Sequence, residues 1–191
     1  MKKLLLGTAL SAALFSTANA NAADYVIDTD GAHAFVTFKI KHLGYSWLHG
    51  RFNTFSGDFS YDDKAPNASK INVTIDTKSI DSNHAERDKH LKGGDFLDVK
   101  KYPTATFKST DFKSTGEGTG EITGDFTLHG VTKSITFPVE RIGEGDDPWG
   151  GYRAGFMGTT KLKLSDYGID YNLGPASTHV EIELHVEGKR Q

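Results

Sequence analysis

The chain has 191 residues, enough for one domain with a sizeable core, and 37% of them are hydrophobic. It carries 22 Lys and Arg against 25 Asp and Glu, and a mildly acidic chain without a basic cluster argues against nucleic acid as a partner. It has no cysteine, so no disulfide supports the fold and the core must hold it together unaided.

Residues 1–22 have the make-up of a secretory signal peptide. Two lysines are followed by a short, mostly apolar run over residues 4–15, and small residues then surround Ala20 and Ala22. The run is too short for a transmembrane anchor. We expect cleavage after Ala22, with Ala20 as the alternative, export to the periplasm, and a single folded domain over residues 23–191.

Apolar and polar residues alternate with a period of two through most of the remaining chain, which is typical of strands with one buried face. Phe52 falls out of phase and predicts a bulge near Asn53 or Thr54, Pro138 predicts an edge or a bulge, and His129-Gly130 predicts a tight hairpin turn. The alternating runs cover residues 34–40, 55–61, 71–75, 105–107, 122–128, 135–139, 154–164 and 180–186.

This pattern predicts an all-β fold of about eight strands, several of them near ten residues long. Long antiparallel strands with one apolar face favour an up-and-down barrel, with a two-sheet sandwich as the alternative. The interior of an eight-stranded barrel is either filled by side chains or holds one small ligand. A ten-residue strand spans about 33 Å, so such a barrel has room for an extended lipid. Alternation does not say which face points inward, and an outer-membrane barrel stays open as an alternative.

Residues 81–107 form the one stretch with a helical pattern. Asn83 is a candidate N-cap and Glu86, three residues later, completes a capping box. Gly93-Gly94 is expected to end the helix in the left-handed conformation, and Asp95 to cap a further short turn. Two placements remain open. The insert either lies across one end or seam of the barrel and controls access, or it is a surface connection that covers an open edge.

Candidate metal ligands gather in this insert as His84, Glu86, Asp88 and His90. On a helix, the first and third share one face and the other two share another, so the four do not converge. The spacing is not that of a two-histidine zinc motif, and the chain has neither a cysteine nucleophile nor a Gly-x-Ser-x-Gly elbow. We therefore expect no enzymatic activity and no cofactor, with a metal-dependent enzyme that uses the insert as the alternative.

Several further segments, in the same order and over nearly the whole mature chain, resemble the YceI-like family of exported, lipocalin-like proteins that bind polyisoprenoids. They are His33–Phe35, Lys41–Gly44, Gly50–Gly57, Asn83–Leu91, Asp95–Asp98, Tyr102–Phe107, Gly124–Lys133 and Gly145–Gly150. Phe96-Leu97 stands where the family pattern often has two phenylalanines. The resemblance implies an eight-stranded antiparallel lipocalin-like β-barrel with a short helical insert. Its pore would hold a long prenyl chain, such as a polyprenyl phosphate or a quinone-like lipid.

The resemblance also implies a protein without established enzymatic activity that is often a homodimer, and transient contact with membranes fits a lipid carrier. We assign the pocket to the apolar alternating positions and one histidine. His42 is either a core histidine or a polar contact at the cavity mouth, and His42, Arg51 and Arg87 are candidates for the head group. The predicted ligand-binding residues are Val36, Phe38, Ile40, His42, Phe55, Phe59, Ile71, Val73, Ile75, Phe107, Ile122, Phe126, Leu128, Ile135, Phe137, Phe156, Leu162, Ile182 and Leu184.

Overall fold

The structure is a computed structural model that describes residues 22–191. The predicted signal peptide therefore lies outside the described residues, apart from Ala22. Within these residues one helix, α1 (Ala85–Leu91), interrupts a series of strands, with short 3₁₀ turns at Pro66–Ala68, Thr77–Ser79, Leu164–Tyr167 and Pro175–Ser177. The strands are β1 (Ala23–Ile27), β2 (Phe35–His42), β3 (Ser46–Phe52), β4 (Phe55–Tyr61), β5 (Lys70–Asp76), β6 (Ile80–Asp81), β7 (Thr104–Gly116), β8 (Thr119–Leu128), β9 (Val131–Asp146), β10 (Tyr152–Lys163) and β11 (His179–Arg190).

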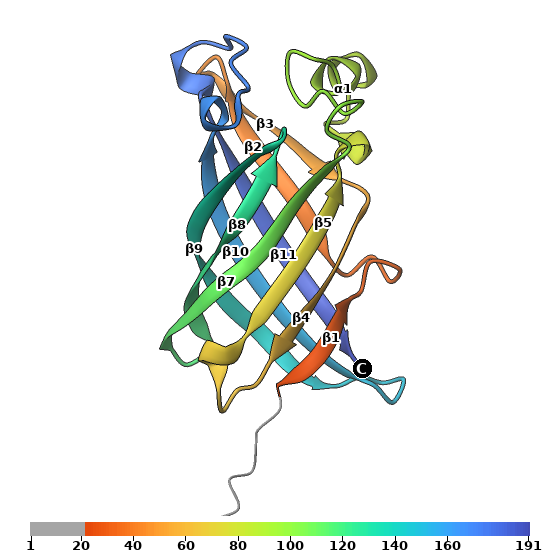
Figure 1. The fold of residues 1–191 in the computed structure, drawn as a ribbon. Helices are drawn as coiled ribbons and strands as arrows, with labels where there is room; N and C mark the ends of the chain where they lie inside the picture. Colours follow the sequence, from red (N-terminus) through yellow and green to blue (C-terminus); the bar gives the residue numbers. More distant parts are fainter. Residues whose placement is uncertain (1–21) are drawn as a thin grey trace, which may run out of the picture.

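The sheet closes on itself as an antiparallel barrel (Figure 1). Eight strands pair in the order β1-β4-β5-β7-β8-β9-β10-β11, and β11 returns to pair with β1. β11 also pairs with β2, so β1 and β2 lie end to end along it. β3 and β4 likewise lie end to end, with β3 paired to β2 and β4 paired to β1. The closed eight-stranded barrel confirms the predicted all-β fold class, and the sandwich alternative is wrong.

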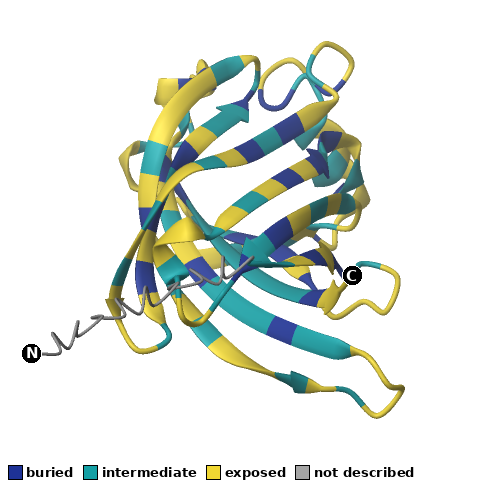
Figure 2. Ribbon diagram, turned by 60° about the horizontal axis from the view of Figure 1, so that its bottom comes forward, coloured by how far each residue is buried: buried dark blue, intermediate teal, exposed yellow. Residues whose placement is uncertain are grey.

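The irregular positions lie where the pattern places them. β3 ends at Phe52 and β4 begins at Phe55, so the break falls on the two residues where a bulge is expected. Pro138 lies one residue beyond the last pair of β9 with β10, Val139–Gly158, and on that side it occupies an edge. Figure 2 shows buried and exposed residues alternating along the strands, because successive side chains point to opposite faces.

The helix boundaries differ from the prediction at both ends. The N-cap is His84, whose Nδ1 accepts from the Arg87 backbone N–H at 3.2 Å. Asn83 precedes it at φ 62, because the Asp81 carboxylate accepts from the Asn83 backbone N–H and turns the chain there. The expected capping box on Asn83 is therefore wrong.

At the C-terminal end of α1, Lys92 is in the right-handed conformation, and neither Gly93 nor Gly94 has a positive φ. The chain turns through right-handed geometry instead, with the Gly93 N–H donating to the His90 carbonyl oxygen at 2.9 Å. Asp95 does not cap a second turn either, since its carboxylate lies 2.9 Å from His90 Nε2. The prediction of a left-handed glycine stop is wrong.

Candidate functional site

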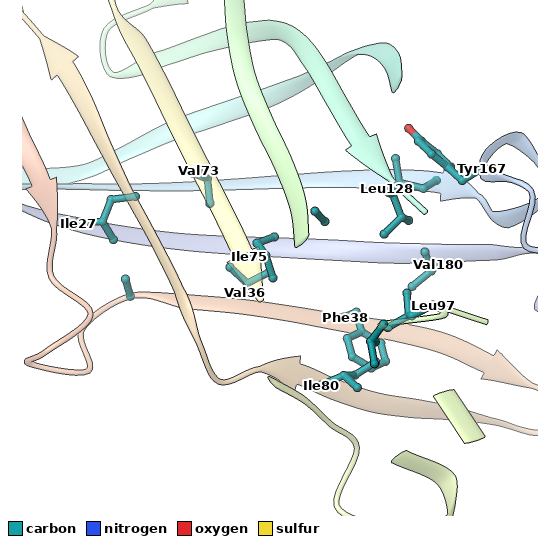
Figure 3. Close-up of a cluster of buried hydrophobic side chains, with 14 of the residues drawn as sticks. Ile27, Val36, Phe38, Val73, Ile75, Ile80, Leu97, Leu128, Tyr167 and Val180 are labelled. Carbon is teal, nitrogen blue, oxygen red and sulfur yellow. The ribbon is translucent and has the colours of Figure 1, made fainter. Parts of the chain in front are cut away.

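The barrel encloses a cavity of about 590 Å³ with a predominantly apolar wall. This volume lies within the usual range of ligand pockets, about 300–1,000 Å³. All of the predicted ligand-binding residues, from Val36 on β2 to Leu184 on β11, line it. Figure 3 shows Val36, Val73 and Leu128 among the buried side chains that point into the interior from different strands. The apolar rows thus face a shared cavity; their contact with a ligand stays a prediction.

The wall also contains residues outside the alternating runs. α1 and the segment after it contribute Leu91, Phe96 and Leu97, and the connection between β10 and β11 contributes Ile169 and Leu173. These side chains come from turns and from a short helix, where no period of two exists. The Phe96-Leu97 pair was visible in the sequence as an apolar motif, but no pattern placed it against the barrel interior.

One end of the cavity is closed by aromatic side chains. Tyr25 stacks on Phe59 with ring centroids 4.7 Å apart, and Phe156 meets both Phe59 and Tyr61 edge to face at 5.5 and 5.0 Å. Burial raises the pKa of Tyr61 to about 12, so its hydroxyl stays neutral, and it donates to Asp63 at 3.1 Å. These contacts tie β1, β4 and β10 together across the interior.

The other end, next to α1, opens to solvent. Among the described residues that line the cavity, those that are exposed lie at this end, apart from Lys70. α1 lies at the rim of this end of the barrel (Figure 1), where Arg87, His90 and Leu91 line the cavity, so it does not merely cover a sheet edge. The exposed lining residues here are Lys41, His42, Leu43, His90, Tyr171 and Asn172. We call this group the mouth.

Aromatic contacts join the two segments that flank the mouth. His90 lies edge to face with Phe96 at 5.0 Å and with Tyr171 at 5.2 Å, and Phe96 and Tyr171 are 5.0 Å apart. These three rings connect the α1 segment to the β10–β11 connection.

The three candidates for a head-group contact have different positions. Arg87 lines the cavity beside the mouth, donating to the Ser82 hydroxyl at 2.7 Å and to the Ser82 carbonyl at 2.5 Å, and no carboxylate of the described residues pairs with it. His42 is exposed at the mouth, so the core-histidine alternative is wrong. Arg51 is exposed on the outer face and pairs across the strands with Asp81. Its assignment is wrong, because strand alternation turns Phe52 inward and Arg51 outward.

The candidate metal ligands of the insert are engaged separately. His84 caps α1, Asp88 accepts from the Ser82 N–H at 2.8 Å, and His90 pairs with Asp95. These contacts hold the side chains in different places, so the insert does not gather them into a metal site.

A second group, Asp28, His33 and Glu187, brings ligand-type atoms within 4.8 Å of one another. Arg153 Nη1 is 2.7 Å from Asp28 and 2.6 Å from Glu187, and Lys189 Nζ is 2.8 Å from Asp28, so protein cations already neutralise it. Burial alone would raise the pKa of Asp28, but hydrogen bonds from Arg153 and Lys189 hold it well below its usual value. These contacts attach the connection between β1 and β2 to the strands β10 and β11.

A closed antiparallel barrel with an apolar cavity open at one end defines the class of lipocalin-like barrels. The chain belongs to the YceI-like family, whose domain matches residues 25–188. It is 60% identical to a UPF0312 protein of Pseudomonas aeruginosa over the full length of both chains.

Two solved structures share this fold. BcnA of Burkholderia cenocepacia superposes with a TM-score of 0.75 at 24% identity, over 84% of this chain and 98% of that one. A polyisoprenoid-binding domain of Saccharophagus degradans gives a TM-score of 0.66 at 18% identity, over 89% and 99%. At these identities the two structures establish the fold.

Proposed function

We propose that this protein is a non-enzymatic carrier that holds a long isoprenoid lipid inside its barrel, in the periplasm. The observation that carries the proposal is the cavity of about 590 Å³, walled by apolar side chains from every side of the barrel and open at one end. The polyisoprenoid-binding domain of Saccharophagus degradans, with the same fold, supports an isoprenoid as the class of ligand.

The distribution of polar groups supports a ligand with a long apolar tail and a polar head, such as a polyprenyl phosphate or a quinone-like lipid. The basic side chains Lys41, His42 and Arg87 lie at or beside the mouth, and the wall between the ends is built mainly of Phe, Ile, Leu and Val. A head group at the mouth would meet these basic side chains while the tail extends into the barrel.

Energetics favour exchange over irreversible capture. Burying a methylene is worth about 0.8 kcal/mol, so a tail of about 40 carbons represents roughly 30 kcal/mol of transfer out of water. The same tail is equally well buried in a membrane, so its transfer between bilayer and barrel is close to balanced. That balance suits a carrier or buffer of lipid.

The outer face of the barrel argues against the membrane-spanning alternative. Transmembrane barrels present an apolar band to lipid. Here the outward positions of β2 and β11 include Thr37, Lys39, Glu181 and Glu183, and Lys39 pairs with Glu181 at 3.1 Å.

Among the described residues, no helix has the length and apolar character needed to cross a membrane.

The direct test is the identity of the bound lipid. The protein is expressed in its native host with its own N-terminal segment, released by osmotic shock, extracted into organic solvent and analysed by mass spectrometry. We expect a prenyl lipid in the extract. We expect the intact mass of the protein to match a chain that begins at Asn21 or Ala23, and light scattering to give the mass of a homodimer. Protein that is repeatedly empty and takes up no added prenyl lipid would refute the carrier proposal.

A pair of variants tests the cavity itself. Val73→Asp places a carboxylate on the apolar wall, whereas Thr74→Asp places it one residue away on the exposed face. We expect the first to lose lipid uptake and the second to keep it, because an unpaired charge is strongly disfavoured in an apolar environment. If Val73→Asp does not fold, Ile182→Trp fills the same cavity without charge, with Glu183→Trp as its outward control. Equal uptake by all variants would contradict the assignment of the wall.

A further inference from the structure

The β2–β3 hairpin carries a local excess of positive charge in an acidic protein. Between Asp30 and Asp58 the chain has Lys39, Lys41 and Arg51, three histidines and no acidic residue. Glu181 of β11 pairs with Lys39, and Asp81 of β6 lies opposite Arg51. Lys41, nearest the tip, forms no ion pair among the described residues, so its charge is available to a partner.

The tip of this hairpin exposes large apolar side chains. Leu43 is 54% exposed, Tyr45 88% and Trp47 44%. The turn is tight, with Leu43 and Gly44 both at positive φ and the Tyr45 N–H donating to the His42 carbonyl at 2.9 Å. The tip therefore projects these side chains from a defined turn and does not fold them back onto the barrel.

The chemistry of the tip is that of membrane interfaces. Tyr and Trp prefer the interface because their rings are apolar at one end and polar at the other, and lysine keeps its charge in water while its stem lies on apolar surface. Lys39 and Lys41 both lie over the Trp47 ring, at 5.1 and 5.6 Å from its centroid. A basic segment next to exposed aromatic residues is attracted to anionic lipids.

The position of the tip matches that of the mouth. Leu43 and Lys41 line the cavity, and the Ser177 hydroxyl donates to the Lys41 carbonyl at 2.5 Å, which joins the hairpin to the β10–β11 connection. Tyr171 of that connection is also 46% exposed. The hairpin tip, α1 and this connection lie together at the same end of the barrel (Figure 1).

We propose that the β2–β3 tip docks the protein on an anionic lipid bilayer, with Tyr45 and Trp47 in the interface and the mouth turned toward the membrane. Docking serves lipid exchange only if the proposed carrier function is correct. Vesicle binding itself is measured whether or not a lipid is in the barrel, so the two proposals can fail separately. The opposite end also exposes apolar side chains, with Ile142 63% and Trp149 77% exposed, but its charge differs. The β9–β10 hairpin there, residues 140–153, has four acidic and two basic residues, so it is not attracted to anionic lipid. The Arg153 guanidinium lies 5.4 Å from the centroid of the Trp149 ring.

The two tryptophans of the chain make the orientation measurable, because Trp47 is on β3 next to the β2–β3 turn and Trp149 is in the β9–β10 connection. These two connections lie at opposite ends of the barrel (Figure 1). Trp149→Phe leaves Trp47 as the single reporter, and Trp47→Phe leaves Trp149. With phosphatidylglycerol vesicles that contain brominated lipid, we expect quenching of Trp47 and unchanged emission from Trp149. Quenching of both, of Trp149 alone, or of neither would overturn the proposal.

A flotation assay with exported, processed protein tests the energetics. We expect Tyr45→Ser to weaken binding to phosphatidylglycerol vesicles about tenfold, and Trp149→Ser to leave it unchanged. Replacing phosphatidylglycerol by phosphatidylcholine should weaken the wild type about fivefold for each basic residue that reaches the surface. Neither serine variant alters a residue of the cavity wall, so prenyl lipid uptake from detergent should persist in both. If Tyr45→Ser binds vesicles normally but dissociates a dimer in sedimentation, the tip is a self-association surface and the docking proposal is wrong.

Discussion

The two ends of this barrel are built differently. At the end opposite α1, four rings from β1, β4 and β10 meet across the interior, and Asp28 is surrounded by Arg153, Lys189 and His33 on the outside. At the α1 end, the cavity lining is exposed and short connections replace strand pairing. Closure and access are therefore assigned to separate ends of one sheet, so stability and ligand exchange should respond to different substitutions.

The closed end should carry the largest stability effect. Phe59→Ala removes the stack on Tyr25 and the edge contact with Phe156, in a region where Phe59 is 5% exposed. Truncation of a buried phenylalanine costs about 3–5 kcal/mol, and urea unfolding followed by circular dichroism measures it. The matched substitution at the open end, Tyr171→Ala, removes a half-exposed ring and should cost less than half as much. Equal losses would show that the two ends are not separate in stability.

Disruption of the ion-pair cluster around Asp28 should cause the next largest loss of stability. Asp28→Asn leaves Arg153 and Lys189 without their buried carboxylate, which is 1% exposed, and should cost about 2–3 kcal/mol in the free energy of unfolding at neutral pH. Asp147→Asn, which removes a partner of Arg153 at the loop surface, should cost less. An Asp28→Asn variant as stable as the wild type would show that the cluster does not secure this end.

The same carboxylate predicts an acid dependence. The pKa of Asp28 is lower in the folded than in the unfolded chain, where it is about 3.9. The stabilisation is therefore fully present above that value and is lost as the pH falls toward the folded pKa. Wild type should lose more stability than Asp28→Asn between about pH 5 and pH 2 in urea unfolding. Parallel pH profiles for the two proteins would assign the acid sensitivity to other carboxylates.

Much of the fold followed from the sequence because a period of two assigns each side chain to a face. Once Val36, Val73 and Leu184 are known to share the apolar face of their strands, closure of the sheet brings them to one interior. The alternation also explains the error at Arg51. The alternation of apolar and polar residues changes phase between β3 and β4, and only the strand register shows which residues near this break face the interior.

The rest depended on contacts that no local pattern encodes. Asn83 and His84 are both able to cap a helix, and the choice was made by the Asp81 carboxylate, which holds the Asn83 N–H. Phe96 and Tyr171 meet at the mouth although they are 75 positions apart in the sequence, and neither lies in a strand. The wall could therefore be predicted, whereas the mouth needed the three-dimensional arrangement.

The ring contacts beside the mouth, at the open end, should have the smallest effect on stability. Tyr171→Ala removes ring contacts with His90 and Phe96, the ones that join the α1 segment to the β10–β11 connection. An aromatic pair is worth about 0.5–1.5 kcal/mol, so release of a bound fluorescent prenyl analogue into cyclodextrin should accelerate about tenfold, while the free energy of unfolding falls by less than half of the loss at Phe59→Ala. Tyr45→Ala removes a ring at the same end that lines no part of the cavity, and should leave the release rate unchanged. Equal rates in all three proteins would mean that the lipid leaves by another route, and the open seam beyond Val139–Gly158, where β9 and β10 part, would be the place to look.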